Sequence, residues 1–431
     1  MSCLHQFVNN VASAYKSRNA HAFELLFTLD PTATNITTLQ QELSTYQDDA
    51  AYEQIVDSIL DDISMSLAGL TTKYLHLIQY LQNADLMLVF DLYEGLYNSD
   101  GAYLVPLVKN LSSELVNLAL TVDKTLGLQG KSQKVNNAAR LLSKMFNMML
   151  ADRSSIDTNK PSKRLGIFHV TNLAFKVYFK LNTVRMCQTF IANLRTGGVK
   201  LDQYPISQQV TYQYYLGRYS LSQNRLRAAE KCLVFAFEKC TYHQWHNKRL
   251  ILQYLIPTRL ILGKFPRPEL MAKYELVDYY EPLVTTLKTG DYNGFLQHLE
   301  YHFDYFYNSF TYVLLRERGK VLLWRSLLRK TYVYLCAIGQ KTLNTMPLQQ
   351  CQKALRFSMK AEDMDLADVE CILVSLVSQG YIKGYIHHQK KMMVLSKVNP
   401  FPRVVDVNLH TEVYDEEAIN QHLAIVEGQE Q

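Results

Sequence analysis

The chain has 431 residues, 48% of them hydrophobic, and its 45 basic and 40 acidic residues give a formal net charge of +5. Glycine and proline number only 17 and 11, which excludes collagen-like, linker-rich and disordered classes and argues against an all-β fold. No apolar run reaches the ~18 residues that a membrane helix needs, so we expect no membrane partner.

Seven cysteines are scattered along the sequence, and residues 1–10 lack the basic and then apolar pattern of a secretory signal. An odd number of cysteines in a chain of this length indicates reduced thiols, as in the cytosol or nucleus. At ~150 residues per domain, the length predicts two or three domains.

The first part of the chain, residues 1–152, is predicted to be an N-terminal helical region. Apolar side chains at helical spacing predict a helix over Ala51–Leu70, and the pattern returns over Leu75–Leu96 and Tyr103–Leu126. Turn-forming residues at 98–101 separate the last two of these helices.

Paired helices are predicted over residues 165–318, after a polar loop at 152–164. Gln208–Ser222 and Leu226–Lys239 are one such pair, each with an apolar face that only a neighbouring helix can cover. Gly217 would allow the two helices to approach closely. The region therefore has the layout of a helical repeat.

The next part, residues 319–403, has the element order of a winged helix. Three helices are predicted over Val321–Ile338, Pro347–Phe357 and Asp365–Gln379. The last of these has the clearest apolar stripe, with an Asp at its N-cap and a Gly after its C-terminus.

After the third helix the hydrophobic period changes from that of a helix to two. Ile382–His387 and Met392–Ser396 are predicted to be the strands of a β-hairpin. Residues 404–431 are predicted to be an acidic, flexible tail.

Helical repeats that run into a C-terminal winged helix resemble the PCI domain, found in subunits of the proteasome lid, the signalosome and a translation initiation factor. Three segments are similar to one branch, the PCI domain-containing protein 2 family, the PCI subunit of transcription-and-export complex 2 (TREX-2). These segments are VTYQYYLGRYSLSQNRLRAAEKCLVFAFEKC (Val210–Cys240), NKRLILQYLIPTRLILGKFP (Asn247–Pro266) and DVECILVSLVSQGYIKGYIHHQKKMMVLSKVNPFP (Asp368–Pro402). The resemblance implies an all-α fold, a right-handed helical-repeat superhelix followed by a winged helix with a small β-hairpin.

By resemblance, the chain is a non-enzymatic scaffold subunit, without a cofactor, of a nuclear complex that couples transcription to mRNA export at the nuclear pore. Its implied partners are a larger PCI-domain scaffold protein and the small acidic, disordered subunit shared with the proteasome lid. The two winged helices would form a platform that binds RNA and DNA without sequence preference. The implied location is the nucleus, including its periphery, with some cytoplasmic pool.

Two alternatives stay open at this point. A paralogous branch, first named for the signalosome, pairs with a different PCI scaffold linked to transcription elongation and splicing, and the quoted segments do not separate the two branches. The other alternative, an RNA-processing enzyme, is disfavoured because no acid/base or metal cluster is visible in the sequence.

The predicted hairpin segment, Tyr381–Arg403, contains five basic residues and no acidic residue. Such a segment suits the backbone of nucleic acid, because lysine neutralises phosphate and releases counterions. The predicted nucleic-acid-binding residues are Lys383, Lys390, Lys391, Lys397 and Arg403. The alternative is an ordinary solvated hairpin, since lysines on edge strands also prevent aggregation.

The helix before this hairpin carries only acidic charges, Asp365, Asp368 and Glu370. A helix that reads a DNA groove normally brings Arg, Lys, Asn or Gln to the base edges. We therefore expect backbone binding without sequence choice, through the hairpin and a partner's surface.

A second basic stretch runs from Arg225 to Lys264, where eight basic and two acidic residues give a local charge of +6. Aromatic residues lie between the charges, which suits a short acidic peptide because aromatic and Arg side chains are common interface hot spots. The predicted partner-binding residues are Arg225, Arg227, Trp245, Lys248, Arg249, Tyr254, Arg259 and Lys264. A solvated repeat surface and an RNA-binding surface are the alternatives.

No catalytic and no metal site is predicted. Cys232 and Cys240, followed by two histidines, have a superficially ligand-like spacing. Eight residues of helix would separate these thiols by about 12 Å, which is too far for one zinc ion. His298 and His302 lack the glutamate directly after the first histidine that the metalloprotease pattern requires.

Overall fold

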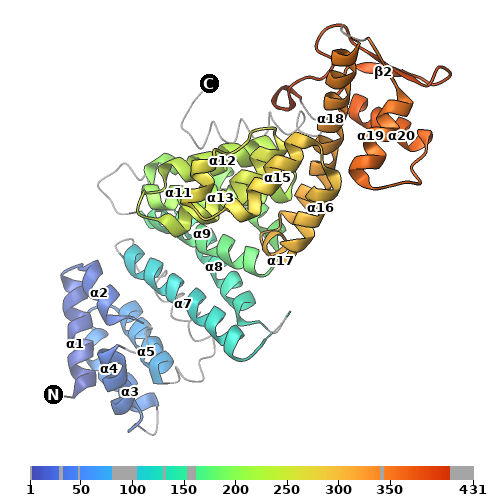
Figure 1. Cartoon of the computed structure of the whole chain (residues 1–431). Coiled ribbons are helices and arrows are strands. Elements are labelled where there is room, and N and C mark those ends of the chain that lie inside the picture. The colour runs from blue at the N-terminus through green and yellow to red at the C-terminus, as the bar shows by residue number, and fades with distance from the viewer. Residues whose placement is uncertain are drawn as a thin grey trace. The chain divides into compact units, whose positions relative to one another are not determined.

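The computed structural model describes residues 2–28, 33–46, 49–79, 104–128, 130, 133–152, 162–339 and 344–407. Helices dominate this part of the chain, and its strands form one small antiparallel sheet (Figure 1). The residues fall into two compact units that divide between Tyr215 and Leu216. Within the described ranges, no helix is both long and apolar enough to span a bilayer.

The N-terminal unit begins with five helices, and the first, second and fifth of them supply the rings of an aromatic cluster. They are α1 (Cys3–Lys16), α2 (Ala20–Leu26), α3 (Thr34–Leu43), α4 (Asp49–Leu60) and α5 (Met65–Gln79). The ring of Tyr74 stacks on Phe7 at 5.7 Å between centroids and lies 4.8 Å from the ring of Phe27. The Tyr74 hydroxyl lies 3.1 Å from the carbonyl of Leu26 and 2.7 Å from that of Thr28, so its polar end is satisfied within the cluster.

The single helix predicted over Ala51–Leu70 is wrong, because the chain breaks there into α4 and α5. A turn at residues 61–63 separates them, and the Ser64 hydroxyl accepts from the Leu67 amide at 3.4 Å. Serine at this place caps a new helix rather than continuing the old one. Most of the helix predicted over Leu75–Leu96, from residue 80 on, and the turn at 98–101 lie outside the described residues.

Further helices follow in this unit, and the last of them ends beyond the unit's boundary at Tyr215. They are α7 (Val105–Thr125), α8 (Lys134–Ala151), α9 (Ile167–Lys180), α10 (Cys187–Thr196) and α11 (Ile206–Ser222), with short 3-10 turns η4 (Lys163–Gly166), η5 (Val184–Met186) and η6 (Leu201–Gln203). The helix predicted over Tyr103–Leu126 is confirmed by α7. Asp123 near its end accepts from the amides of Lys134 and Val135 at 2.6 and 3.1 Å. One carboxylate thus satisfies two orphan donors and complements the dipole at the start of α8.

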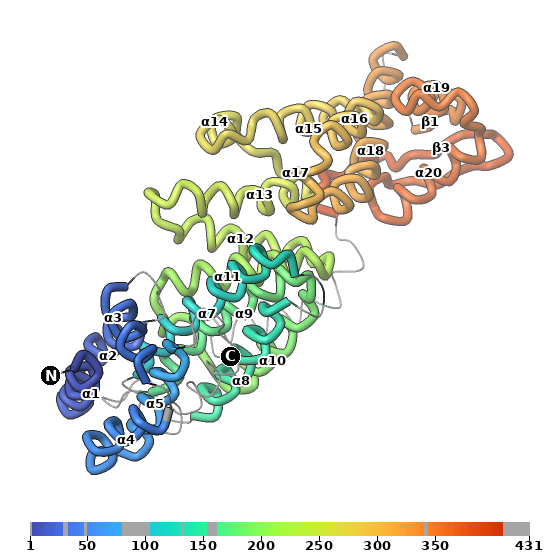
Figure 2. The backbone as a smooth tube through the Cα atoms, turned by 90° about the horizontal axis from the view of Figure 1, so that it is seen from below, coloured from blue at the N-terminus to red at the C-terminus, as the bar shows by residue number. Residues whose placement is uncertain are grey.

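The C-terminal unit starts with helices packed side by side (Figures 1 and 2). They are the end of α11, then α12 (Leu226–Lys239), α13 (Trp245–Ile261), α14 (Pro268–Lys273), α15 (Val277–Thr289), α16 (Tyr292–Tyr301) and α17 (Phe303–Asn308). The predicted close approach at Gly217 is confirmed, since a Cβ there would lie 2.7 Å from Leu233 Cγ. A larger residue would push α11 and α12 apart.

The winged helix follows at the end of the same unit. Its elements are α18 (Tyr312–Ile338), β1 (Thr345–Pro347), α19 (Leu348–Met359), α20 (Leu366–Ser378), β2 (Gly384–His387) and β3 (Met392–Leu395). The sheet order is β1-β3-β2, with both pairs antiparallel. The predicted hairpin and its three helices are confirmed, whereas β1 was not predicted.

Helix α18 is longer than predicted, because it begins at Tyr312 instead of Val321. It contacts α13, α15 and α16 as well as α19 and α20, so one continuous helix joins the helical stack to the winged helix. The predicted boundary between residues 318 and 319 falls inside it. The predicted domain boundaries remain predictions.

The caps predicted for the helix before the hairpin are confirmed. Asp365 accepts from the Asp368 amide at 2.8 Å, and the Asp368 carboxylate accepts from the Asp365 amide at 3.0 Å. This is a capping box with two aspartates. Gly380 follows the helix with a φ of +79°, in the left-handed region that favours glycine.

Residues 400–407, called here the strap, return from the hairpin to the helical stack and include the 3-10 turn η7 (Val404–Asp406). Gly263, with a φ of +77°, lies so close to the strap that a Cβ would be 2.6 Å from Val404 Cβ. The ring of Phe401 lies 5.5 Å from that of Tyr332 on α18. The predicted tail from residue 408 on lies outside the described residues.

Candidate nucleic-acid and partner interfaces

The predicted nucleic-acid-binding lysines lie at the two ends of the hairpin. Lys390 and Lys391 are in the turn between β2 and β3. Lys383 precedes β2, and its carbonyl accepts from the Ser396 amide at 2.9 Å, which places it beside Lys397 at the base. Strands of four residues separate the two ends by about 13 Å.

Four of these five cations are exposed, whereas the fifth has an acidic partner. Lys383, Lys390, Lys397 and Arg403 are exposed. Lys391 is half-buried, has a φ of +51°, and places its Nζ 3.2 Å from Glu370 Oε1. The charge of Lys391 is therefore already paired.

Glu370 connects α20 to the turn of the hairpin. His388 Nδ1 lies 2.8 Å from its other oxygen, Oε2. The hydrogen bond to His388, together with that from Lys391, holds the pKa of Glu370 below its ordinary value. The acidic groups of α20 are thus used within the winged helix, two in the capping box and one on the hairpin.

The predicted partner-binding residues fall into three groups, and the first is buried. Lys248 and Tyr254 on α13 are each 8% exposed. Lys248 Nζ donates to the carbonyl of Phe237 at 2.6 Å and lies 4.4 Å from the centre of the Phe237 ring, while Arg218 lies over the ring of Tyr254. These contacts place both residues in the packing of the helical stack rather than on a surface that a partner can reach.

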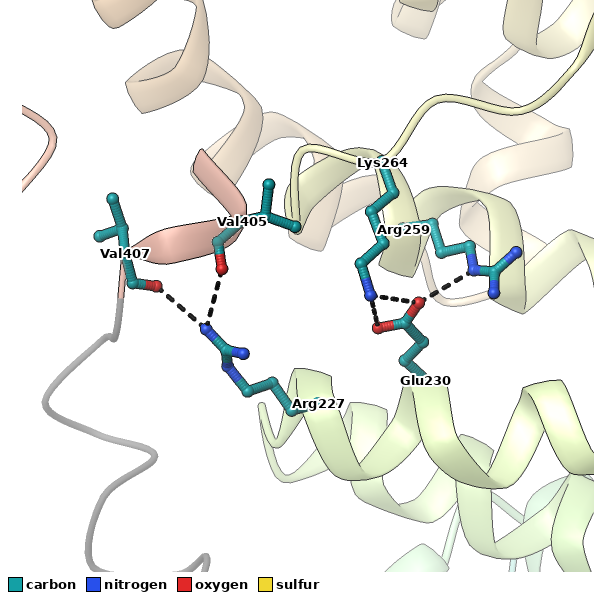
Figure 3. Close-up of polar contacts among 6 residues, drawn as sticks. All are labelled: Arg227, Glu230, Arg259, Lys264, Val405 and Val407. Atoms are coloured by element: carbon teal, nitrogen blue, oxygen red, sulfur yellow. Dashed lines mark hydrogen bonds and ion pairs between the residues drawn. The ribbon is translucent and has the colours of Figure 1, made fainter. Parts of the chain in front are cut away.

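The second group is an ion-pair cluster around Glu230 of α12 (Figure 3). Arg259 Nε lies 2.9 Å from Oε1, and Lys264 Nζ lies 2.7 Å from Oε2. The side chains of Arg259 and Lys264 are 40% and 45% exposed, whereas that of Glu230 is 12% exposed. An acidic ligand at these cations would have to compete with Glu230.

Arg227 lies near this cluster and holds the strap (Figure 3). Its Nη2 donates to the carbonyls of Val405 and Val407, each at 3.3 Å. Arg225, just before α12, is half-buried. Arg227 thus acts within the fold, because it connects the start of α12 to the strap.

The third group lies at the start of α13. Trp245 Nε1 donates to the carbonyl of Lys273 at 3.0 Å, and Arg249 Nε donates to that of Tyr274 at 3.1 Å. Lys273 Nζ lies 4.4 Å from the centre of the Tyr242 ring, and Tyr242 is 71% exposed. Lys273 was not among the predicted residues, because it lies beyond the basic stretch and meets Tyr242 only in the fold.

Among the described residues, no group of three or more His, Cys, Asp or Glu could hold a metal ion. Cys232 and Cys240 are both buried, and none of the seven cysteines, all of which are described, forms a disulfide. The His298 and His302 rings lie 4.7 Å apart, and His298 Nε2 lies 2.9 Å from the carbonyl of Tyr279. These two histidines take part in the packing of α15 and α16.

A helical stack that continues through α18 into a winged helix is the architecture of a PCI-domain protein, and the PCI domain family matches residues 304–397. A PCI domain-containing protein of Schizosaccharomyces pombe (strain 972) is 32% identical over 91% of this chain and 93% of its own length. PCI domain-containing protein 2 of Danio rerio is 32% identical over 70% of this chain and 74% of its own. Enhanced ethylene response protein 5 of Arabidopsis thaliana is 34% identical over 71% and 72%.

These relatives confirm the resemblance inferred from the sequence. The chain belongs to the PCI domain-containing protein 2 family. PCI-domain proteins are scaffold-type proteins that generally assemble with other PCI proteins, and the chain is a scaffold protein of this kind.

Proposed function

We propose that the chain is a non-enzymatic subunit of TREX-2, the nuclear PCI complex that couples transcription to mRNA export. With a larger PCI partner and a small acidic subunit, it forms a platform that binds RNA and DNA without sequence preference. Family membership supports this assignment, and it implies a nuclear location that includes the nuclear periphery.

The observation that carries the nucleic-acid part is the charge distribution of the winged helix. The hairpin presents Lys383, Lys390 and Lys397 to solvent, and residues 381–403 contain no acidic side chain. The acids of α20 bind its own N-terminus and the hairpin turn. Lysines without base-reading partners favour contact with phosphates and not with base edges.

The test uses the complex reconstituted with its PCI partner and the small acidic subunit. We expect Lys383, Lys390 and Lys397, changed together to Gln, to weaken binding of single-stranded RNA. With a slope of ~0.7 per lost contact, three contacts should lower the salt dependence of log K by ~2. Fluorescence anisotropy at several salt concentrations measures the slope.

Two controls make this test specific. Changing Lys16, Lys124 and Lys180 to Gln removes the same charge from exposed lysines of the N-terminal unit and should leave the slope unchanged. Changing Lys391 to Gln should also leave it nearly unchanged, because that lysine is paired with Glu370. If the hairpin variant and the control variant lose the same amount of salt dependence, the hairpin has no specific role in binding.

The complex itself is assigned by its partners. A tagged chain purified from nuclear extract should recover the TREX-2 scaffold together with the small acidic subunit, identified by mass spectrometry. Recovery of the other PCI scaffold instead would contradict the export assignment and place the chain in the transcription and splicing branch.

For the small acidic subunit, we propose a surface that runs from the Glu230 cluster to the start of α13. Its exposed or half-buried members are Arg225, Trp245, Arg249, Arg259 and Lys264, joined by Tyr242 and Lys273. These cations and aromatic rings suit acidic side chains that alternate with aromatic anchors. Lys248 and Tyr254 are not part of this surface, because both are buried in the helical stack beneath it.

A further inference from the structure

A cavity of about 440 Å³ lies within the C-terminal unit, where the strap crosses the ends of the helical stack. Its walls come from the end of α13, from α15 and α18, and from residues 399–405. Apolar side chains, among them Leu260, Leu287 and Phe401, form part of the lining. The cavity is separate from the exposed lysines at the tip of the hairpin.

The charged side chains that line the cavity are all basic. They are Lys288, Arg325, Arg329 and Arg403. None of the lining residues is acidic, and none of these four cations forms an ion pair with a described residue. Lys288 Nζ instead lies 5.1 Å from the centre of the Phe265 ring. Four uncompensated cations around one cavity create a positive potential that an anion would relieve.

Arg325 is the buried member of this group, with only 9% of its surface exposed. Its Nη2 donates to the carbonyls of Phe401 at 3.5 Å and of Pro402 at shorter range. Its Nε is buried and has no hydrogen-bond partner among the described residues. Burial, together with the nearby Arg329, lowers the pKa of Arg325. A buried guanidinium donor without a partner is costly, so the site favours a ligand that supplies an acceptor oxygen.

We propose that this cavity binds a small ligand that carries two or more phosphate groups. Guanidinium groups match the oxygens of phosphate, and burial strengthens such charge-assisted bonds. One phosphate carries at most two negative charges near neutral pH, so four cations match an oligophosphate better than a single phosphate. The apolar part of the wall can take an uncharged portion of the ligand.

The ligand would also stabilise the position of the strap, which follows the hairpin, against the helical stack of this unit. Arg325 holds the carbonyls of Phe401 and Pro402, and Arg403 from the same strap lines the cavity. An oligophosphate bridging Arg403 to Lys288 or Arg329 would fasten the strap to α15 and α18. Occupancy would therefore protect the strap from exchange and proteolysis.

The test is calorimetric titration of the full chain with inorganic triphosphate. We expect saturable binding with one site, and a loss of at least about tenfold when Lys288 and Arg329 are both changed to Gln. Both are exposed at the rim, so the variant should fold. Lys330→Gln is the matched control, because this exposed lysine follows Arg329 on α18 but does not line the cavity. Its affinity should stay within twofold.

Three further outcomes are informative. Changing Lys383, Lys390 and Lys397 should leave triphosphate binding unchanged, so this proposal can fail or stand independently of the nucleic-acid platform. If short single-stranded RNA displaces triphosphate, the phosphates come from a nucleic-acid backbone; if not, they come from a small molecule. An absence of saturable binding, or an equal loss in Lys330→Gln, would overturn the proposal.

Discussion

The Glu230 cluster offers a direct test of the proposed surface for the acidic subunit. Changing Glu230 to Gln keeps the shape of the side chain but removes the carboxylate that Arg259 and Lys264 contact at 2.9 and 2.7 Å. The local charge of residues 225–264 rises from +6 to +7, since eight basic residues then face one acidic residue. We expect the variant to bind the acidic subunit more tightly while its own fold becomes less stable.

The size of both effects follows from the exposure of the pairs. Arg259 and Lys264 are close to half exposed, and such pairs contribute ~0.2–1 kcal/mol each. The loss of both should lower the free energy of unfolding by ~0.4–2 kcal/mol. If the acidic subunit supplies replacement carboxylates of equal worth, its affinity should increase by about two- to thirty-fold.

Urea denaturation measures the first quantity, and titration of the labelled acidic subunit at low and moderate salt measures the second. Glu238→Gln is the matched control, because it removes the same charge from an exposed position of α12 away from the cluster. A variant that loses stability as expected but binds the subunit with unchanged affinity would refute this location. The reverse change, Arg259→Glu, is less suitable because it sets a second carboxylate against Glu230.

Two further predictions concern buried side chains. Burial raises the pKa of the Cys351 thiol to about 12. Iodoacetamide should therefore label exposed Cys3 and Cys371 in the native chain but Cys351 only after denaturation, which peptide mass spectrometry measures. Rapid labelling of Cys351 in the native chain would contradict its burial. Burial lowers the pKa of His169 in the folded chain, and the nearby charge of Lys109 lowers it further. The contribution of the neutral His169 side chain to stability is therefore present above the unfolded pKa of ~6.5, and it is lost as the pH falls through the lower pKa of the folded state. His169→Gln should therefore reduce the acid-induced loss of protection of α9 amides in hydrogen exchange between about pH 7.5 and about pH 5.5, and an unchanged pH dependence would count against it.

The elements that sequence alone could predict are those fixed by local chemistry. The start signal at Asp365 and the stop signal at Gly380 place each end of α20 to within a residue, because a capping box and a left-handed glycine depend on nearby residues. Strand β1 could not be found in this way, since three residues carry too little periodicity and its pairing with β3 is non-local. The break between α4 and α5 was missed because the apolar stripe continues across it.

A charge pattern along the sequence does not define the role of each cation, because that role depends on what the fold places beside it. Within one basic stretch, Lys248 is buried against a carbonyl, Arg227 holds the strap and Arg259 faces Glu230. Spacing could not separate these roles, since each contact joins residues from different elements.

The cavity under the strap likewise has no sequence signature. Lys288, Arg325 and Arg403 are far apart in the chain, and they meet at one cavity because α15 packs on α18 and the strap returns to the helical stack. The wing lysines are close in sequence but divided between the two ends of a hairpin, where flexible side chains meet solvent. Such lysines suit a ligand bound through long-range charge, whereas a buried guanidinium with an unpaired donor suits a ligand that forms a direct hydrogen bond inside the cavity. The two proposed sites therefore differ in the kind of anion that each would favour.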